Sequence, residues 1–177
     1  LYVDGDDTVI NGGDGFDRVD VQGTDGVNID MAASSIEQAF GNAGDDTFDG
    51  SGLTTRLTSY GRAGDDEITG GSNRDYLRGD AGEDTLSGND GNDGNDNLYG
   101  GDDNDKLSGD AGNDRLYGEN GNDVISGGDG AGQLIGGAGA DELRGGDGND
   151  RLYVDGDDTV IDGGDHFYTG RTDELWA

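Results

Sequence analysis

A nine-residue repeat constrains the fold of this chain more than any other feature. Seven consecutive copies fill the stretch from Gly91 to Tyr153, each close to the pattern G-G-x-G-x-D-x-U-x, in which U is a large aliphatic residue. A fixed period this short is typical of a solenoid, in which each repeat packs only against its neighbours. The U residues of this stretch are Leu98, Leu107, Leu116, Ile125, Leu134, Leu143 and Leu152.

Each repeat divides into a six-residue turn and a three-residue strand. Glycine at positions one, two and four permits positive φ and close backbone approach, so six residues can curl into a tight turn. In the strand the side chains alternate, which sends U inward and positions seven and nine outward. The aspartate at position six lies where the turn meets the strand. A carboxylate there, beside converging backbone carbonyls, offers the hard oxygen ligands that calcium takes in sets of six to eight.

These repeats resemble the RTX (repeats-in-toxin) β-roll family. The resemblance implies an all-β fold, a right-handed parallel β-roll with two short-stranded sheets, in which two nonapeptides make one coil. It also implies several calcium ions between stacked turns, each held by position-six carboxylates and by backbone carbonyls from positions one to five. The predicted calcium ligands are Asp7, Asp17, Asp46, Asp66, Asp75, Asp84, Asp96, Asp105, Asp114, Asp123, Asp141, Asp150 and Asp158.

The aspartates have a simpler alternative explanation as turn formers, a role that Asp and Asn fill well. Turn chemistry alone does not demand Asp at the sixth place with Gly at the fourth in copy after copy. Stacked coils about 4.7–4.9 Å apart would also bring the aspartates of one edge into a column of like charges. Cations between them would convert this repulsion into ligation.

Composition favours a chain that needs counter-charge to fold. There are 41 acidic and 10 basic residues among 177, a net charge of −31, and hydrophobic content is 29%, below the roughly 45–50% of an average globular domain. We expect disorder without calcium and folding on calcium binding. The charge also disfavours nucleic acid and anionic membranes as partners. The absence of cysteine excludes disulfides and thiolate metal sites.

A catalytic role is not expected. His166 is the only histidine, and the sequence offers no set of partner residues with which it could form a catalytic triad or a zinc site. The carboxylate pairs that a glycosidase needs are the repeat's own ligand positions. The sequence instead predicts a calcium-binding module of a larger secreted protein, of bacterial type. The end of the chain, Asp173-Glu-Leu-Trp-Ala, loosely resembles the carboxyl-terminal signal of type I secreted proteins.

The chain is interpreted as one solenoid over residues 1–177. Opening repeats occupy 1–20, degenerate coils 21–60, regular repeats 61–165 and a divergent tail or cap 166–177. For residues 21–40 two interpretations stand: a coil that continues the stack without metal turns, or a capping excursion. The decapeptide LYVDGDDTVI occurs at 1–10 and again at 152–161, an offset of 151 residues. We therefore expect a parent protein that repeats this block in tandem.

The irregular repeats lead to separate structural predictions. Residues 50–60 keep only Leu57 as an inward residue and lack Asp at position six, which predicts a metal-free turn held by Thr and Ser hydroxyls. Residues 88–90 look like a three-residue insertion that bulges outward. In the last partial repeat, Val160 is expected to point inward. Gly132 replaces the position-six aspartate, which predicts a weak or vacant ligand set in the otherwise regular run.

One face of the predicted roll is a candidate binding surface. Alternate repeats share a sheet, so positions seven and nine of one sheet bring tyrosines beside arginines. Such a face suits stacking on sugar rings or docking another protein, which makes polysaccharide binding or adhesion the alternative function. A tyrosine ladder that only shields the sheet is the competing explanation. The residues of this face are Tyr76, Arg78, Tyr99, Arg115, Tyr117, Arg151 and Tyr153.

Overall fold

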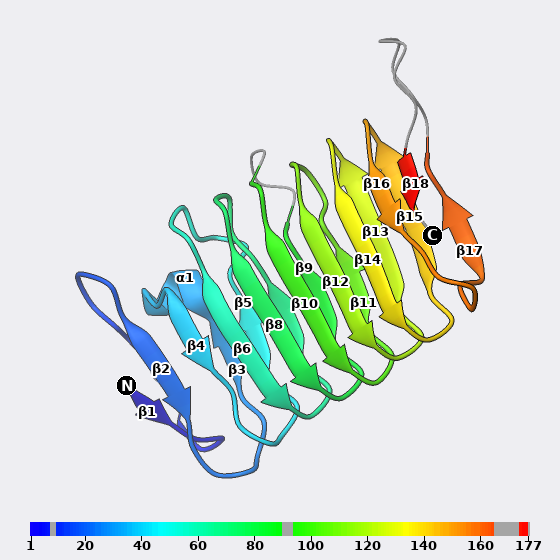
Figure 1. Ribbon diagram of the computed structural model, residues 1–177. Coiled ribbons are helices and arrows are strands. Elements are labelled where there is room, and N and C mark those ends of the chain that lie inside the picture. Colours follow the sequence, from blue (N-terminus) through cyan, green and yellow to red (C-terminus); the bar gives the residue numbers. More distant parts are fainter. Residues whose placement is uncertain (8–9, 90–93, 165–173, 177) are drawn as a thin grey trace.

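The computed structural model is a solenoid of two parallel β-sheets stacked face to face (Figure 1). It describes residues 1–7, 10–89 and 94–164, together with strand β18 at residues 174–176. The chain alternates between the sheets, so each coil contributes one strand to each. This confirms the all-β, parallel solenoid predicted from the repeat. Of the residues predicted to cap the stack, Phe167 lies outside the described residues, while Leu175 and Trp176 lie in β18, at the end of the ten-stranded sheet.

The ten-stranded sheet, called sheet A below, takes every second strand of the chain. Its strands are β1 (Tyr2–Val3), β2 (Arg18–Val21), β4 (Gln38–Phe40), β6 (Thr58–Ala63), β8 (Tyr76–Ala81), β10 (Asn97–Asp102), β12 (Arg115–Asn120), β14 (Gln133–Ala138), β16 (Arg151–Tyr153) and β18 (Glu174–Trp176).

The eight-stranded sheet, sheet B, takes the strands between them. These are β3 (Asn28–Asp30), β5 (Thr47–Asp49), β7 (Glu67–Thr69), β9 (Thr85–Ser87), β11 (Lys106–Ser108), β13 (Val124–Asp129), β15 (Glu142–Asp147) and β17 (Val160–Asp162).

The core is a single file of U residues on each sheet. On sheet A, Leu98 pairs with Leu116, Leu116 with Leu134, and Leu134 with Leu152. All four side chains are fully buried. Their strand neighbours at positions seven and nine are more exposed, as the period-two alternation requires. This register confirms that repeats two apart in sequence lie directly above one another.

Residues 21–40 continue the stack. β3 joins sheet B and β4 joins sheet A, each paired in parallel with the coil above it. Between them lies the short helix α1 (Met31–Ser34), where the Asp30 side chain accepts a hydrogen bond from the N–H of Ala33 at 2.8 Å. Ser35 ends the helix with a φ of 53°. The structure thus matches the continuing coil, with one helical turn inserted.

Two predicted inward positions were wrong. Ser59, not Leu57, holds the U position of its strand, because it pairs with Leu77 on β8. Leu57 is buried at position six instead, and Leu53 is buried as well, so this turn is filled by leucines rather than by Thr and Ser hydroxyls. In the last repeat Ile161, not Val160, pairs with Leu143.

Gly88 and Asn89 do not form the outward bulge predicted for residues 88–90. The N–H of Gly88 donates to Ser108 O at 2.8 Å, as the N–H of Gly70 does to Ser87 O one coil below. Asn89 has a φ of 82°, typical of position two in these turns. Gly88 and Asn89 therefore open the turn, while Asp90 lies outside the described residues.

No helix among the described residues is long and apolar enough to span a membrane.

Candidate metal centre

The position-six aspartates form two columns, one along each edge of the stack. Column A lies in the turns that lead into sheet A, and column B in the turns that lead into sheet B. Column A contains Asp17, Asp75, Asp96, Asp114 and Asp150; column B contains Asp46, Asp66, Asp84, Asp105, Asp123, Asp141 and Asp158. Ten of these twelve are at most 2% exposed, while Asp17 and Asp158 are half-buried.

Asp7 stands apart from both columns. It is exposed, and its carboxylate accepts a hydrogen bond from the N–H of Asp4 in its own turn at 2.9 Å. Of the thirteen predicted ligands it is the one that the structure does not bring into a column.

Within each column one carboxylate oxygen binds the coil below. The N–H of Asp105 donates to Asp123 Oδ1 at 2.8 Å, and the N–H of Asp123 donates to Asp141 Oδ1 at 2.8 Å. The same bond recurs through Asp46, Asp66 and Asp84 in column B and through Asp75 and Asp96 in column A. This ladder explains why the aspartates hold one geometry from coil to coil.

Position five carries a second ladder that the sequence did not predict. The N–H of Asn113 donates to Asn95 Oδ1 at 2.8 Å, and the N–H of Asn122 donates to Asn104 Oδ1 at 2.8 Å. Here the upper coil donates to the lower one, the reverse of position six. Adjacent turns are therefore tied in both directions, and the recurrence of Asn before the aspartate was the available signal.

The second carboxylate oxygen is the unusual feature of the columns. Among the described residues, a set of position-six Oδ2 atoms is buried with no hydrogen-bond partner. These are the Oδ2 atoms of Asp17, Asp66, Asp84, Asp105, Asp114, Asp123 and Asp141. Buried carboxylate oxygens are normally paired, because an unpaired one loses its hydration without compensation.

This oxygen lies beside the glycine at position one of its own turn in the turns of Asp66, Asp84, Asp105, Asp114, Asp123 and Asp141. A Cβ added at Gly100 would lie 2.2 Å from Asp105 Oδ2 and 2.8 Å from the carbonyl oxygen of Gly118 in the coil above. The same pair of oxygens surrounds Gly118, with Asp123 Oδ2 at 2.1 Å and Gly136 O at 2.5 Å. Two acceptors thus converge where a side chain would otherwise lie, and only glycine leaves that space open.

Burial makes these carboxyl groups weak acids in the absence of a counter-ion. Burial raises the pKa of Asp66 and of Asp105 to about 8, and the charges of neighbouring aspartates add to this. Burial likewise raises the pKa of Asp84 and of Asp96 to about 7. The columns therefore favour either protonation or a bound cation at neutral pH.

Calcium fits this donor set. The ion supplies positive charge and six to eight positions for hard oxygen ligands. Among the described residues no three acidic or histidine side chains gather closely enough to hold a metal by themselves. Backbone carbonyls would have to complete each ligand set, and the position-one carbonyls beside the Oδ2 atoms of Asp105 and Asp123 are placed to do so.

Comparison with known proteins agrees with this chemistry. The sequence matches the RTX calcium-binding nonapeptide repeat in four copies, at residues 35–52, 60–93, 90–125 and 126–161, which together cover more than half of the chain. The chain belongs to the RTX calcium-binding repeat family. Neither the curated proteins nor the solved structures gave a match.

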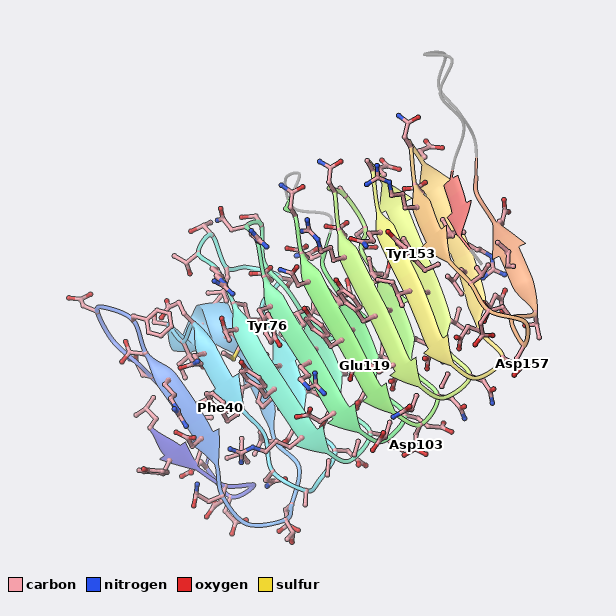
Figure 2. The ribbon with its side chains drawn as sticks, viewed as in Figure 1. Phe40, Tyr76, Asp103, Glu119, Tyr153 and Asp157 are labelled. Carbon is pink, nitrogen blue, oxygen red and sulfur yellow. The ribbon has the colours of Figure 1, made fainter. Side chains whose placement is uncertain are left out.

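The RTX repeats of sheet A also form the predicted tyrosine and arginine face. The rings of Tyr99 and Tyr117 stack with centroids 4.8 Å apart and planes 3° from parallel, and Tyr76 lies 5.2 Å from Tyr99. Tyr60 and Phe40 extend the same ladder. Figure 2 shows Phe40, Tyr76 and Tyr153 along this sheet, while Asp103 and Asp157 project from the turns.

This ring geometry limits what the face offers a ligand. Because Tyr99 and Tyr117 cover each other's faces, a sugar ring meets mainly their edges. Arg78 is engaged with Asp80 and with Glu119, the latter at 3.0 Å. Of the predicted binding face, Arg115 and Tyr153 are exposed and therefore the more accessible to a polysaccharide or protein ligand.

The replacement of the position-six aspartate by Gly132 gives a first prediction. Asp150 Oδ1 accepts from the N–H of Gly132 at 2.7 Å, so the ladder continues above, but Gly132 offers no carboxylate to Asp114 below. A Cβ at Gly132 would meet Leu134 Cδ1 at 2.9 Å, the end of a flexible side chain, and Asp150 Oδ1 at 3.3 Å. Gly132→Asp is expected to tighten calcium binding about tenfold, or about 1.4 kcal/mol, and to lower stability in chelator.

Calcium titration and thermal melts of Gly132→Asp, with Gly132→Ala as the control, test this. Ala introduces the Cβ without the carboxylate and should show neither effect. An unchanged calcium midpoint in a normally folded Gly132→Asp variant would mean that the ligand roles are assigned wrongly.

The raised pKa values give a second prediction. Because Asp66, Asp84 and Asp105 have pKa values of about 7 to 8 when folded and about 3.9 when unfolded, the metal-free fold binds more protons than the unfolded chain between these values. Its stability is therefore greatest below about pH 4 and is lost as the pH rises through 7 to 8. In chelator, β signal in circular dichroism should increase on acidification from pH 8 to pH 5.

In saturating calcium the slope should reverse, because protons compete with the ion for the same carboxylates. Equal pH slopes with and without calcium would contradict the assignment of these aspartates as ligands.

Proposed function

We propose that this chain is a calcium-responsive folding module of a larger secreted protein. It is disordered where calcium is scarce and folds where calcium is plentiful, outside a bacterial cell. The observation that carries the proposal is the row of buried Oδ2 atoms without hydrogen-bond partners, which lie beside a backbone carbonyl at Asp66, Asp105, Asp114 and Asp123. Membership of the RTX calcium-binding repeat family supports it.

Charge supports the dependence on calcium. A net charge of −31 opposes a compact chain, and the two columns concentrate like charges along the edges. In the unfolded chain the same carboxylates are hydrated and far apart. Bound calcium therefore stabilises the folded state selectively, and each site adds RT ln(1 + [Ca²⁺]/Kd) to the stability. Several such sites in one stack make folding steep in calcium concentration.

The proposed role is mechanical and not catalytic. An unfolded, strongly acidic chain is suited to passage through a narrow export channel, such as that of type I secretion, and folding afterwards keeps the parent protein outside. Sites of extracellular type, with Kd of about 10⁻⁴–10⁻³ M, stay empty in a low-calcium cytosol and fill outside it.

Circular dichroism across a calcium titration tests the proposal. We expect a disordered spectrum in chelator, a cooperative gain of β signal near millimolar calcium, and little effect of magnesium, which resists the dehydration that all-protein oxygen cages require. A β-sheet circular dichroism spectrum that does not change when calcium is removed would contradict the proposal.

A further inference from the structure

The turns of this solenoid are of two kinds. In the first kind, called open turns here, position two has a positive φ and the Oδ2 of the position-six aspartate has no partner. Position two has a φ of 84° at Arg62, 82° at Asp80 and 79° at Glu119, which precede Asp66, Asp84 and Asp123. The remaining open turns have Gly13, Gly101, Asp110 and Gly137 at position two and Asp17, Asp105, Asp114 and Asp141 at position six.

The second kind, closed turns, occurs in nonapeptide turns at Asp46 and Asp75. In the shorter turns at the two ends of the stack, Asp7 Oδ2 and Asp158 Oδ2 are also paired, with the N–H groups of Asp4 and Asp155. The N–H of Asn42 donates to Asp46 Oδ2 at 2.9 Å, and the N–H of Gly71 donates to Asp75 Oδ2 at 2.7 Å. Neither Asn42 nor Gly71 has a positive φ. Each carboxylate also accepts from the coil below through Oδ1. Both oxygens are thus paired within the protein, as a metal-free buried carboxylate requires.

Strand length separates the two kinds of turn along column B. In the open turns after β6, β8, β10 and β12, the strand extends through position two, so Arg62 pairs with Asp80 and Gly101 with Glu119 in the sheet. The peptide group at position two then takes part in strand pairing with the neighbouring coil. Strand β4 ends at Phe40, which leaves the N–H of Asn42 at position two available to Asp46 of its own turn.

The closed turns at Asp46 and Asp75 lie directly above coils that have no carboxylate at position six. The coil below Asp46 has Val27 at position six, and the coil below Asp75 has Leu57 there, as the bonds from their N–H groups to Asp46 Oδ1 and Asp75 Oδ1 show. At these two levels no carboxylate from below is available to share an ion. The backbone N–H takes the place that a cation takes higher in the column.

The coils beneath these levels have a denser apolar core. Residues 18–57 contain 10 buried hydrophobic side chains in 40 residues, among them Met31, Ile36 and Phe48, whereas the 88 described residues of 61–152 contain 10. Burial of apolar area, the main source of stability, is therefore more than twice as dense per residue in the first segment. Within residues 18–57 no position-six carboxylate oxygen is among the partnerless ones.

We propose that residues 18–57 form a metal-independent base of the solenoid. Asp46, at the lower end of column B, and Asp75, at the lower end of the unbroken run Asp75, Asp96 and Asp114 of column A, then accept backbone hydrogen bonds instead of binding calcium. This inference rests on the proposed function, since it divides the chain into a base that folds alone and coils that fold onto it with calcium. The base then removes the cost of nucleating the first coil, and calcium drives propagation from it.

Hydrogen exchange of the full chain tests the base. In chelator, amides of residues 18–57 should be protected and amides of residues 98–152 should exchange as in an unfolded chain, while calcium should protect both. Uniform lack of protection in chelator would overturn the base and leave the proposed function standing. Uniform protection in chelator would overturn the proposed function itself.

A matched pair of variants tests the two kinds of turn. Asp75 and Asp123 are both at most 1% exposed, and both accept through Oδ1 from the coil below; they differ in whether Oδ2 is paired. Asp123→Asn should lose bound calcium and raise the calcium midpoint about tenfold or more, the range seen when partners of metal ligands are lost. Asp75→Asn should keep the calcium count of the original chain. A loss of calcium in Asp75→Asn equal to that in Asp123→Asn would overturn the assignment.

Discussion

Gly118→Ala is expected to abolish calcium binding at its level of column B and to destabilise the calcium-loaded fold by about 1–3 kcal/mol from overpacking alone. The new Cβ would lie 2.1 Å from Asp123 Oδ2 and 2.5 Å from Gly136 O, closer than carbon and oxygen can approach. Both oxygens belong to the proposed ligand set, so the methyl group displaces the ligands as well as the backbone. Calcium counting by equilibrium dialysis and a thermal melt in calcium measure the two effects.

Gly156→Ala is the control for this prediction. It makes the same chemical change at a glycine where an added Cβ meets no atom within 4 Å and φ is not left-handed. It should therefore leave both the calcium count and the melting temperature nearly unchanged. A Gly118→Ala variant that behaves like Gly156→Ala would show that the space beside position one does not hold the ion.

Truncation of the core should have an effect of similar size. Leu116→Ala is expected to cost about 2–5 kcal/mol, the usual range for buried leucine. Leu116 is fully buried between Leu98 and Leu134, and a core one residue thick has no second layer that can move into the cavity. Because each coil is supported only by its neighbours, the loss should also uncouple the coils on either side.

Calcium-dependent thermal melts of Leu116→Ala and Val124→Ala compare a core position with a surface position. Val124 lies at position seven and is 37% exposed, so its truncation should change stability by less than about 0.5 kcal/mol. A similar melting temperature for both variants would contradict a core made of one U residue per strand.

The repeat pattern predicted those features of the fold that depend on local spacing. Glycine at position one, aspartate at position six and U at position eight recur at fixed intervals, so the two sheets and the two columns follow from counting. The prediction failed where two apolar residues compete for one place. Val160 and Ile161 are adjacent, and a one-residue slip reverses the side of the sheet that each faces. Hydrophobicity alone does not choose between them.

The error at Leu57 has a related cause. The sequence offered Leu57 as the inward residue of a strand, but position six of these turns is itself buried, so a leucine fits there as well as an aspartate. Ser59 could then take the core position, because Leu53 and Leu57 already fill the interior around it.

The two kinds of turn were beyond prediction from residue types. The turn that contains Gly71 is closed and the turn that contains Gly101 is open, although both have glycine at position two of the repeat. In column B the length of the preceding strand separates the two kinds, and strand length depends on pairing with neighbouring coils, which no single repeat encodes.

The position of the calcium ions tests the account most directly. A crystal structure of the chain grown in calcium, with anomalous difference maps to locate the metal, should place ions against the Oδ2 atoms of Asp105 and Asp123 and leave Asp75 Oδ2 bonded to the N–H of Gly71. A folded chain in which calcium lies elsewhere, with Asp105 Oδ2 and Asp123 Oδ2 still without a cation, would contradict the claim that these oxygens are the calcium ligands.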